Sequence, residues 1–509
     1  MPAQPSPTPP DVSSSRGPKL PRSLSIWQAV GLSVALMAPS MAVNINPQGT
    51  GASVGRAVPL AFLLAGAAVL LLAYVFVRLC QHFHSAGSVY AFVGASLGPR
   101  AGLVAGWCLL GAYLLFGVVT SSAAGIFGVA FLQETGVWAH PARWSPFVLV
   151  AAALLAALWL SMSPAKRGTH VLITVEAATV ALILVVSTVV LVRLLSGSAP
   201  GGNAFTLSVF RVQPGTSWSA LFLGIVFGFL SFAGFEAAAT LGEEAVEPRR
   251  DIPRAILGTA LFGGLYFVSV TAVEVMGFGT DPAGLKAFAA SSSLLGDLGG
   301  SYVGSWAGAA ITLGTTVSAF GCCLASMVGA SRVTYALFRD VVGDRGPGRV
   351  SASGVPGGAV VLTAATMGVI VLVCATLLSA RPKDTFLWSG TTGTLILLVA
   401  YGLTTVGGIW LIFVRRVMTV AAWQVVIPLG ALGMLGYTLY RSVVPYPEGK
   451  AERWFPVVAG AWVLAAVVLV VAAPGMARRL GAALAVETGI TEQGPAGPRS
   501  ARRRDDEGS

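Results

Sequence analysis

Charge is scarce in this sequence, and histidine is scarcer still. Only 10% of the 509 residues are charged, and four are histidine. Soluble globular proteins average about 25% charged residues, so this chain has too few to cover a water-facing surface. The histidines lie in loops or at the ends of apolar segments, spread over several connections: His82, His84, His140 and His170. They form no cluster suited to catalysis, and we expect that the protein is not an enzyme.

Cysteine is also rare, and none of the cysteines has zinc-ligand spacing. The five cysteines all lie in or beside apolar segments: Cys80, Cys108, Cys322, Cys323 and Cys374. An odd number in such surroundings indicates small buried side chains rather than a disulfide framework. We therefore expect no metal site and no other cofactor.

The sequence contains long apolar segments with almost no charged residues. Residues 58–77 and 145–164 contain no charged side chain, and 171–192 contain one acid, Glu176. A hydrocarbon core of about 30 Å is crossed by about 20 apolar residues in a helix, and it satisfies no backbone polar group. The segments do not alternate as barrel strands do. They predict an all-α integral membrane protein with about twelve transmembrane helices. The predicted spans are 26–46, 58–79, 101–133, 145–163, 169–193, 218–243, 254–278, 303–338, 357–379, 386–414, 421–441 and 454–474.

The two ends of the chain differ from this core. Residues 1–25 are rich in Pro, Ser and Thr, and residues 476–509 end in a basic run, so both are predicted to be disordered tails around the core at 26–475. Cytoplasmic loops of membrane proteins carry the excess Lys and Arg. With both tails inside, the inner segments hold most of the 32 Lys and Arg residues. The net charge of +11 therefore indicates orientation in the cytoplasmic membrane, with both termini cytoplasmic, and not a nucleic-acid partner.

Two of the predicted spans are interrupted. Pro39 in the first span removes a backbone donor and predicts a break between Met37 and Ser40. Gly228 and Gly234 mark the sixth span. The two interruptions are five spans apart, the interval of two inverted five-helix repeats, whose broken helices form a midplane binding site. We expect repeats at about 26–193 and 218–414, with extra helices at about 421–474.

Three acids lie within the predicted spans or at their ends: Glu176 in the fifth, Glu236 in the sixth and Glu274 in the seventh. An acid inside a membrane costs roughly 2.5–3.5 kcal/mol and needs a polar environment. Burial favours the protonated form, which suits proton exchange. Glu236 and Glu176 are the candidates for proton coupling, whereas Glu274 is expected near the outer water interface.

Three motifs resemble those of amino acid–polyamine–organocation (APC) permeases. The first is the Gly-Phe-Glu at 234–236 and the segment after it, where Glu247 replaces the usual Asn. The second, at 85–107, resembles the family's loop and amphipathic helix between spans two and three. The third, at 331–340, resembles the end of its eighth span. Residues of the first motif that match are Phe235, Glu243, Glu244, Pro248, Ile252, Pro253 and Ala255.

The resemblance implies a leucine-transporter-type fold, with five-plus-five inverted repeats and two further helices, that works by alternating access. The substrate would lie between the breaks, flanked by spans three, eight and ten. The resemblance implies that the substrate-binding residues are Ala38, Pro39, Ser40 and Met41 at the first break, Ser231, Phe232, Ala233 and Gly234 at the second, and Tyr113 and Trp388 beside them. Phe232 is expected to be an aromatic gate. The family's Gly-Ser/Thr-Gly is absent at the first break, and Pro39 has no N–H. Whether the ligand carries a carboxylate therefore stays open.

The sequence therefore predicts a transporter of amino acids or related amines in the lipid bilayer, coupled to a proton or a counter-substrate. Sodium coupling through Thr316 or Ser318 ranks lower, because hydroxyls in membrane helices commonly bond their own backbone. The alternative is a non-transporting sensor or channel for small amines. No repeated pore motif or soluble output domain supports it. The oligomeric state stays open.

Overall fold

The computed structural model describes residues 25–83, 89–162, 167–241, 245–342, 346–349, 355–444, 446, 449, 451–472 and 474–475. The predicted tails, apart from Ser25, lie outside the described residues. Every element within the described ranges is a helix. The α-helices are α1 Ile26–Met37, α2 Pro39–Val54, α3 Val58–His82, α4 Val89–Leu97, α5 Pro99–Glu134, α6 Ser145–Met162, α7 Arg167–Ser196, α8 Trp218–Phe232, α9 Pro248–Phe278, α10 Pro282–Ala290, α11 Leu294–Tyr302, α12 Ser305–Val342, α13 Gly357–Thr376, α14 Pro382–Ile409, α15 Val426–Arg441 and α16 Trp454–Ala472.

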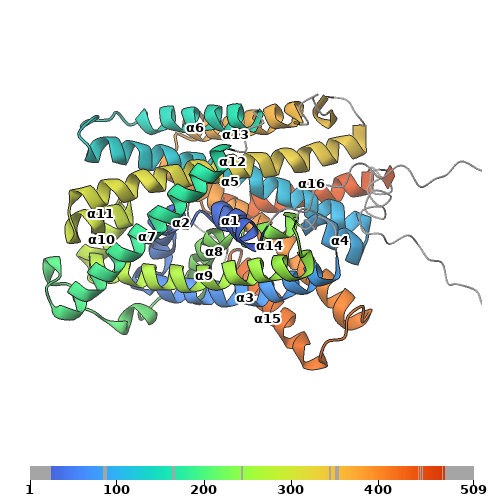
Figure 1. Cartoon of the computed structure of the whole chain (residues 1–509), viewed down its shortest axis with the longest axis horizontal. Helices are drawn as coiled ribbons and strands as arrows, with labels where there is room; N and C mark the ends of the chain where they lie inside the picture. The colour runs from blue at the N-terminus through green and yellow to red at the C-terminus, as the bar shows by residue number, and fades with distance from the viewer. Residues whose placement is uncertain are drawn as a thin grey trace, which may run out of the picture.

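Ten helical segments of the described residues are long and apolar enough to cross a membrane. One of them, Ile26–His82, contains two predicted spans, and the apolar Trp218–Phe232 is shorter than the rest. The count of about twelve spans stays a prediction. The short helices α10 and α11 were not predicted. They lie at one end of the bundle, and α4 lies at the other (Figure 1).

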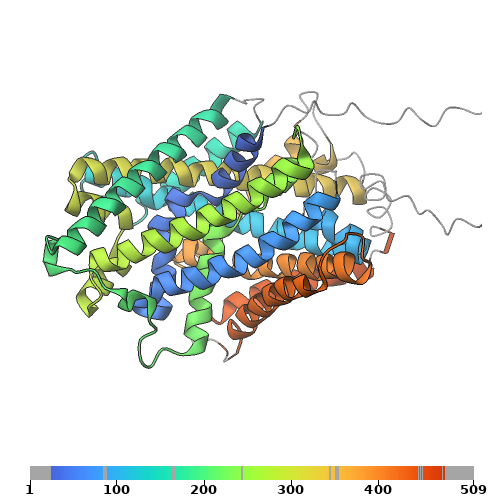
Figure 2. The ribbon, with the colours of Figure 1, turned by 60° about the horizontal axis from the view of Figure 1, so that its bottom comes forward.

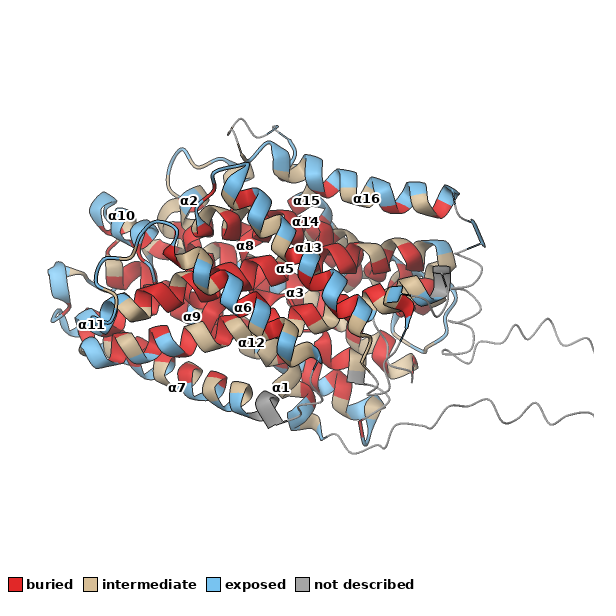
Figure 3. Ribbon diagram, turned by 90° about the horizontal axis from the view of Figure 1, so that it is seen from above, coloured by how far each residue is buried: buried red, intermediate tan, exposed pale blue. Residues whose placement is uncertain are grey.

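Burial divides the bundle into central and peripheral helices (Figure 3). In the most apolar stretch of α5, 78% of the residues are buried, against 17% in α16. The peripheral helices α6, α7, α13 and α16 expose large apolar side chains, among them Trp159, Val185, Leu372 and Val471. Such a surface is unfavourable in water and favourable against hydrocarbon chains. These outer faces are therefore suited to contact lipid.

Several helices pack in pairs that are distant in sequence. α3 lies along α9 (Figure 2), α5 along α12, α2 against α8 and α6 against α13. In the order of the predicted spans, the second helix of each of these four pairs lies five spans after the first, while α5 also packs against α14, seven spans later. Helices from the two halves of the chain thus alternate in the centre of the molecule.

The first predicted span is interrupted as expected. α1 ends at Met37, and α2 begins at Pro39. Ala38 between them has φ 44 and ψ 60, a left-handed conformation that is unfavourable for residues other than glycine. The proline ring clashes with a preceding helical turn, while its missing N–H is tolerated at the first position of a helix. The predicted break between Met37 and Ser40 is confirmed.

The sixth predicted span is interrupted more severely than expected. α8 ends at Phe232 after 15 residues, and the chain turns through Gly234, whose φ is +102. Residues with a side chain rarely adopt that backbone conformation. A short 3-10 helix, Ala237–Leu241, follows. The predicted break is confirmed, but an α-helical continuation toward 243 is wrong in the described part of this segment.

Candidate substrate-binding site

The two breaks lie against each other in the centre of the bundle. A Cβ atom placed on Gly234 would lie 2.9 Å from the Cβ of Leu36, which is too close for any residue but glycine. The Ala238 N–H, just beyond the second break, donates to the Ser33 hydroxyl of α1 at 2.9 Å. The end of α1 and the turn after α8 therefore form a single site.

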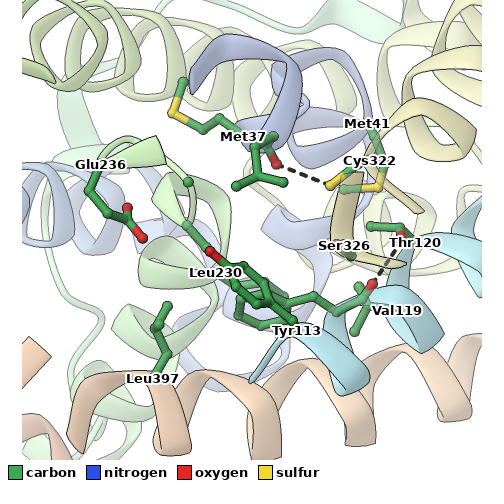
Figure 4. Close-up of a pocket in the computed structure, with 14 residues that line it drawn as sticks. Met37, Met41, Tyr113, Val119, Thr120, Leu230, Glu236, Cys322, Ser326 and Leu397 are labelled. Atoms are coloured by element: carbon green, nitrogen blue, oxygen red, sulfur yellow. Dashed lines mark hydrogen bonds between the residues drawn. The ribbon is translucent and has the colours of Figure 1, made fainter. Parts of the chain in front are cut away.

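A cavity of about 30 Å³, called here the inner cavity, lies at this site (Figure 4). Its lining comes from α1, α2, α5, α8, α12, α14 and the turn after α8, and most of it is apolar. The space is about that of two water molecules. A substrate therefore enters only when flexible side chains such as Met37 and Met41 move aside.

A larger cavity of about 580 Å³, called here the vestibule, adjoins the inner cavity, because Leu36 and Tyr113 line both. It is also lined by Tyr90 of α4, by Ser161 near the end of α6 and by Ala336 near the end of α12. α4 lies at the opposite end of the bundle from α10 and α11 (Figure 1). The vestibule therefore links the breaks to that end of the molecule.

Glu176 of α7 reaches from the vestibule to the first break. Its Oε1 accepts the Ser40 N–H at 2.9 Å, and the residue is 5% exposed. The next N–H, of Met41, donates to the Ser318 hydroxyl of α12 at 3.3 Å. Both Glu176 and Ser318 line the vestibule. α7 and α12 thus hold the beginning of α2, where the positive end of the helix dipole favours a carboxylate.

Beyond the first break, hydrogen bonds join α2 to the hairpin of α10 and α11. Asn44 and Gln48 of α2 are buried and one helical turn apart. Four bonds, called here the hairpin contacts, join them to the hairpin: Ser293 hydroxyl to Asn44 Oδ1 (3.1 Å), Leu295 N–H to Asn44 Oδ1 (2.8 Å), and Gln48 Nε2 to the carbonyls of Phe288 (3.0 Å) and Ser291 (2.8 Å). α2 therefore connects the first break to the hairpin.

Two acids adjoin the hairpin contacts. The Ser291 hydroxyl donates to Asp297 Oδ2 at 2.6 Å. Burial raises the pKa of Asp297 above its ordinary value, and the bond from Ser291 offsets part of that effect. The Thr312 hydroxyl donates to Glu134 Oε1 at 3.0 Å and lies 3.3 Å from the Ser293 hydroxyl. The hairpin is thus joined to α5 and α12 as well.

Glu236 and Glu274 are both buried, and only Glu236 was expected near the site. Glu236 lines the inner cavity at 6% exposure, and its Oε2 has no hydrogen-bond partner among the described residues. The expectation that Glu274 meets water is wrong, since the residue is 0% exposed and the described part of the chain offers neither carboxylate oxygen a hydrogen bond. The physical reason is that the unpredicted α10 and α11 pack on α9.

Comparison with known proteins identifies the family. The family model described as Amino acid permease matches residues 29–432. The chain belongs to the amino acid permease family. It is 28% identical over 258 residues to the low-affinity putrescine importer PlaP of Escherichia coli strain K12, covering 50% of this chain and 53% of the importer. It therefore spans about half the length of that relative.

Two further relatives align over longer segments. Identity is 26% over 324 residues with the uncharacterized amino acid permease YecA of Bacillus subtilis strain 168, covering 64% of this chain and 70% of YecA. It is 26% over 318 residues with the branched-chain amino acid permease BcaP of Lactococcus lactis subsp. cremoris strain MG1363, covering 59% and 65%. Together with the apolar helices, the family makes this chain a multi-pass membrane protein.

The permease brings several of the predicted site residues together. Those that line the inner cavity are Met41, Tyr113, Ala233, Gly234 and Glu236. Ala38, Pro39 and Ser40 are buried at the first break and are not among the lining residues. The Ser231 hydroxyl accepts from Asn46 Nδ2 at 2.7 Å and donates to the Phe227 carbonyl at 3.0 Å.

Two aromatic residues lie elsewhere than predicted. Phe232, the expected gate, packs at a ring-centroid distance of 5.2 Å from Phe267 of α9. Its ring is directed there because Gly66 and Gly263 leave room, and a Cβ on either would lie 3.0–3.3 Å from it. Trp388 is half-buried on α14 and does not line the inner cavity or the vestibule. Phe116 and Tyr113 are the aromatic residues of the inner cavity.

Several lining residues were missed by the sequence analysis. They include Thr120 of α5 and Cys322 and Ser326 of α12. The signal was present, because Tyr113, Phe116 and Thr120 lie at helical spacing on one face of span three, as do Cys322 and Ser326 on span eight. Nothing in the sequence distinguishes this face from the faces that pack against other helices.

Proposed function

We propose that this permease is a secondary transporter that moves amino acids or related amines across the cytoplasmic membrane by alternating access. One observation carries the proposal: the breaks connect to one end of the bundle through the vestibule, while the hairpin contacts close the other end. A site that is reached from one side at a time is what alternating access requires. A channel needs a path that is open at both ends.

The packing of the helices supports an inverted-repeat architecture. Four pairs of packed helices lie five spans apart in the predicted order, and the pair of α2 with α8 contains both broken helices. Two five-helix repeats, related by an axis in the membrane plane, would place their first helices together at the midplane. α15 and α16 are then the two extra helices after the second repeat.

The charge distribution gives the direction of access. The ends of α6 and α12 that line the vestibule precede loops predicted to be cytoplasmic, and Arg332 and Arg339 lie toward that end of α12. We infer that the structure corresponds to an inward-facing state, with both termini in the cytoplasm. Glu176 then meets the cytoplasmic solution through the vestibule, as a proton carrier must.

Uptake by the purified protein in liposomes tests the proposal. The panel includes putrescine and the branched-chain amino acids, because relatives of this chain are named for them. We expect saturable uptake of at least one labelled compound, inhibited by an excess of the same unlabelled compound and accelerated by the compound loaded inside. Liposomes without protein are the control. Absence of uptake by folded protein across the panel overturns the proposal, and flux that does not saturate favours a channel.

A further inference from the structure

The first break has no N–H group left for a substrate carboxylate. Pro39 lacks one, and every other N–H of residues 38–42 already donates inside the protein: Ala38 to the Val34 carbonyl (2.9 Å), Ser40 to the Glu176 carboxylate (2.9 Å), Met41 to the Ser318 hydroxyl (3.3 Å) and Ala42 to the Ala38 carbonyl (2.8 Å). An anion binds at a helix N-terminus by accepting such groups. At this helix an acid of the protein itself, Glu176, occupies that position.

The second break offers no better anion site. The N–H groups of Ala233, Phe235 and Ala237 donate to backbone carbonyls at 3.3, 3.1 and 2.9 Å. Those of Gly234 and Glu236 lie beside the Glu236 carboxyl group, so a substrate carboxylate there would face a carboxyl group. Among the described residues that line the inner cavity, none is Lys, Arg or His. The inner cavity therefore lacks the free backbone N–H groups and the cationic side chain that favour an amino-acid carboxylate, and the nearest cation in a cavity lining is Arg332 of the vestibule.

What the inner cavity does offer is an acid with one unpaired oxygen. Among the described residues, Glu236 Oε2 has no hydrogen-bond partner, and the Tyr401 hydroxyl lies close to the carboxyl group. Figure 4 shows the Glu236 carboxyl directed toward the space between Met37 and Leu230. A buried acceptor without a donor is unfavourable, and a charged donor satisfies it best. An ammonium group is such a donor.

The rest of the lining suits an apolar body. Six of the lining side chains are Met37, Met41, Phe116, Val119, Leu230 and Leu397. Two of the polar side chains beside them are engaged, since the Thr120 hydroxyl donates to the Phe116 carbonyl at 2.7 Å and the Cys322 thiol to the Leu36 carbonyl at 3.0 Å. The neutral hydroxyls of Tyr113 and Ser326 complete the polar part of the lining. The methionines adapt their shape to different apolar groups.

We propose that the substrate is a compact primary amine with an apolar body and no carboxylate, and that Glu236 binds its ammonium group. This inference rests on the proposed transport function and narrows its substrate class. A carboxylate on the same molecule would enter the cavity close to Glu236 and without a Lys, Arg or His among the described lining residues. Glu176, already bonded to the first break, then remains as the acid available for proton coupling.

Pairs of compounds that differ only by a carboxylate test this inference. The pairs are leucine with isoamylamine, phenylalanine with phenethylamine, and ornithine with putrescine, measured by thermal stabilisation of the purified protein and by uptake into liposomes. At least one amine should bind about tenfold or more tightly than its amino acid, because the buried carboxylate is unpaired. Isoamylamine and phenethylamine should bind more tightly than putrescine, whose second ammonium has no acid to pair with.

Variants of Glu236 assign the role of this residue. Glu236→Gln should weaken amine binding about tenfold or more, and Glu236→Asp should keep the preference for amines because it keeps the charge. Glu274→Gln is the matched control, a buried acid that lines neither cavity, and should bind amines as the natural protein does. Melting and gel filtration establish that each variant is folded.

The outcomes separate this inference from the proposed function. Equal or tighter binding of the amino acids, together with uptake, overturns the amine inference and leaves the transporter proposal standing. Full amine binding by folded Glu236→Gln overturns the role of Glu236. If no compound of any pair binds to or is transported by folded protein, both proposals fail.

Discussion

Glu176 and Glu236 are both buried beside a break, but their hydrogen bonds differ. Glu176 accepts the Ser40 N–H, whereas one oxygen of Glu236 has no partner in the part of the chain that the structure describes. Proton loss from Glu176 strengthens its bond to the beginning of α2, because a carboxylate accepts more strongly than a carboxylic acid. Proton gain weakens that bond. The protonation of Glu176 is therefore linked to how firmly the first break is held.

The substitution Glu176→Gln tests whether this residue couples transport to protons. Glutamine keeps an acceptor for the Ser40 N–H but cannot bind or release a proton. A gradient of one pH unit stores about 1.4 kcal/mol and supports about tenfold accumulation at one proton per substrate. In liposomes with such a gradient, we expect accumulation by Glu176→Gln to fall to about the equilibrium level, while exchange of substrate across the membrane continues.

The control for this prediction is Glu274→Gln, which removes another buried acid that is not among the residues lining the vestibule. It should accumulate substrate as the natural protein does. Retained accumulation by Glu176→Gln would contradict the assignment. Loss of accumulation in Glu274→Gln alone would move the proton carrier to α9.

At the scale of secondary-structure elements, α2 is the link between the first break and the hairpin of α10 and α11. Its first turn is held by α7 and α12, and its later turns hold the hairpin through Asn44 and Gln48. Asn44 Nδ2 also donates to the Ser40 carbonyl at 2.9 Å and to the Thr315 hydroxyl at 3.1 Å. Movement of α2 would therefore strain the hairpin contacts.

The substitution Asn44→Ala is expected to loosen the hairpin. It removes the acceptor of the Ser293 hydroxyl and the Leu295 N–H, and each buried hydrogen bond contributes about 1 kcal/mol. Amide hydrogen exchange in Pro282–Ala290 and Leu294–Tyr302 should become about tenfold faster or more.

Amide hydrogen exchange in the peripheral α16 provides an internal reference for the Asn44→Ala protein. The substitution Thr366→Ala provides a control variant that removes a hydrogen bond elsewhere. The Thr366 hydroxyl is exposed and bonds only within α13, to the Leu362 carbonyl. Its substitution should leave exchange in the hairpin unchanged. Unchanged exchange there in folded Asn44→Ala would show that Asn44 does not hold the hairpin.

The two breaks were predictable from sequence, and the hairpin was not. Pro39 and Gly234 impose backbone conformations that depend on local geometry alone, so the sequence indicates them directly. α10 and α11 are short, with nine residues each, and their stability depends on contacts with α2, α9 and α12. The direction of Phe232 depends likewise on the space left by glycines of α3 and α9.

At the scale of the whole molecule, hydropathy predicted the long helices because the bilayer sets their length. It could not predict which residues line a cavity, because that depends on how distant helices meet. Tyr113 and Trp388 are both aromatic residues of predicted spans, yet only Tyr113 lines the inner cavity. The alternation of helices from the two halves of the chain is what brings α1, α5, α8 and α12 to one site.

The orientation of the vestibule can be measured with a cysteine at Ala336, which lines it near the end of α12. The five natural cysteines are buried, so the natural protein reports the background. A membrane-impermeant thiol reagent should label Ala336→Cys in inside-out vesicles several times faster than in right-side-out cells. The exposed Ser198, in the predicted outer loop after α7, supplies the reverse control as Ser198→Cys.

The labelling result tests two inferences separately: the orientation of the bundle in the membrane and the access of water to the vestibule. If Ala336→Cys is labelled from outside and Ser198→Cys from inside, the bundle has the opposite orientation and the positive-charge argument is wrong. If Ala336→Cys is labelled from neither side, the vestibule does not reach water. A substrate that draws the breaks together should slow the labelling of Ala336→Cys, because closing the vestibule removes the reagent's path. Unaltered labelling at a saturating substrate concentration would contradict alternating access at this site.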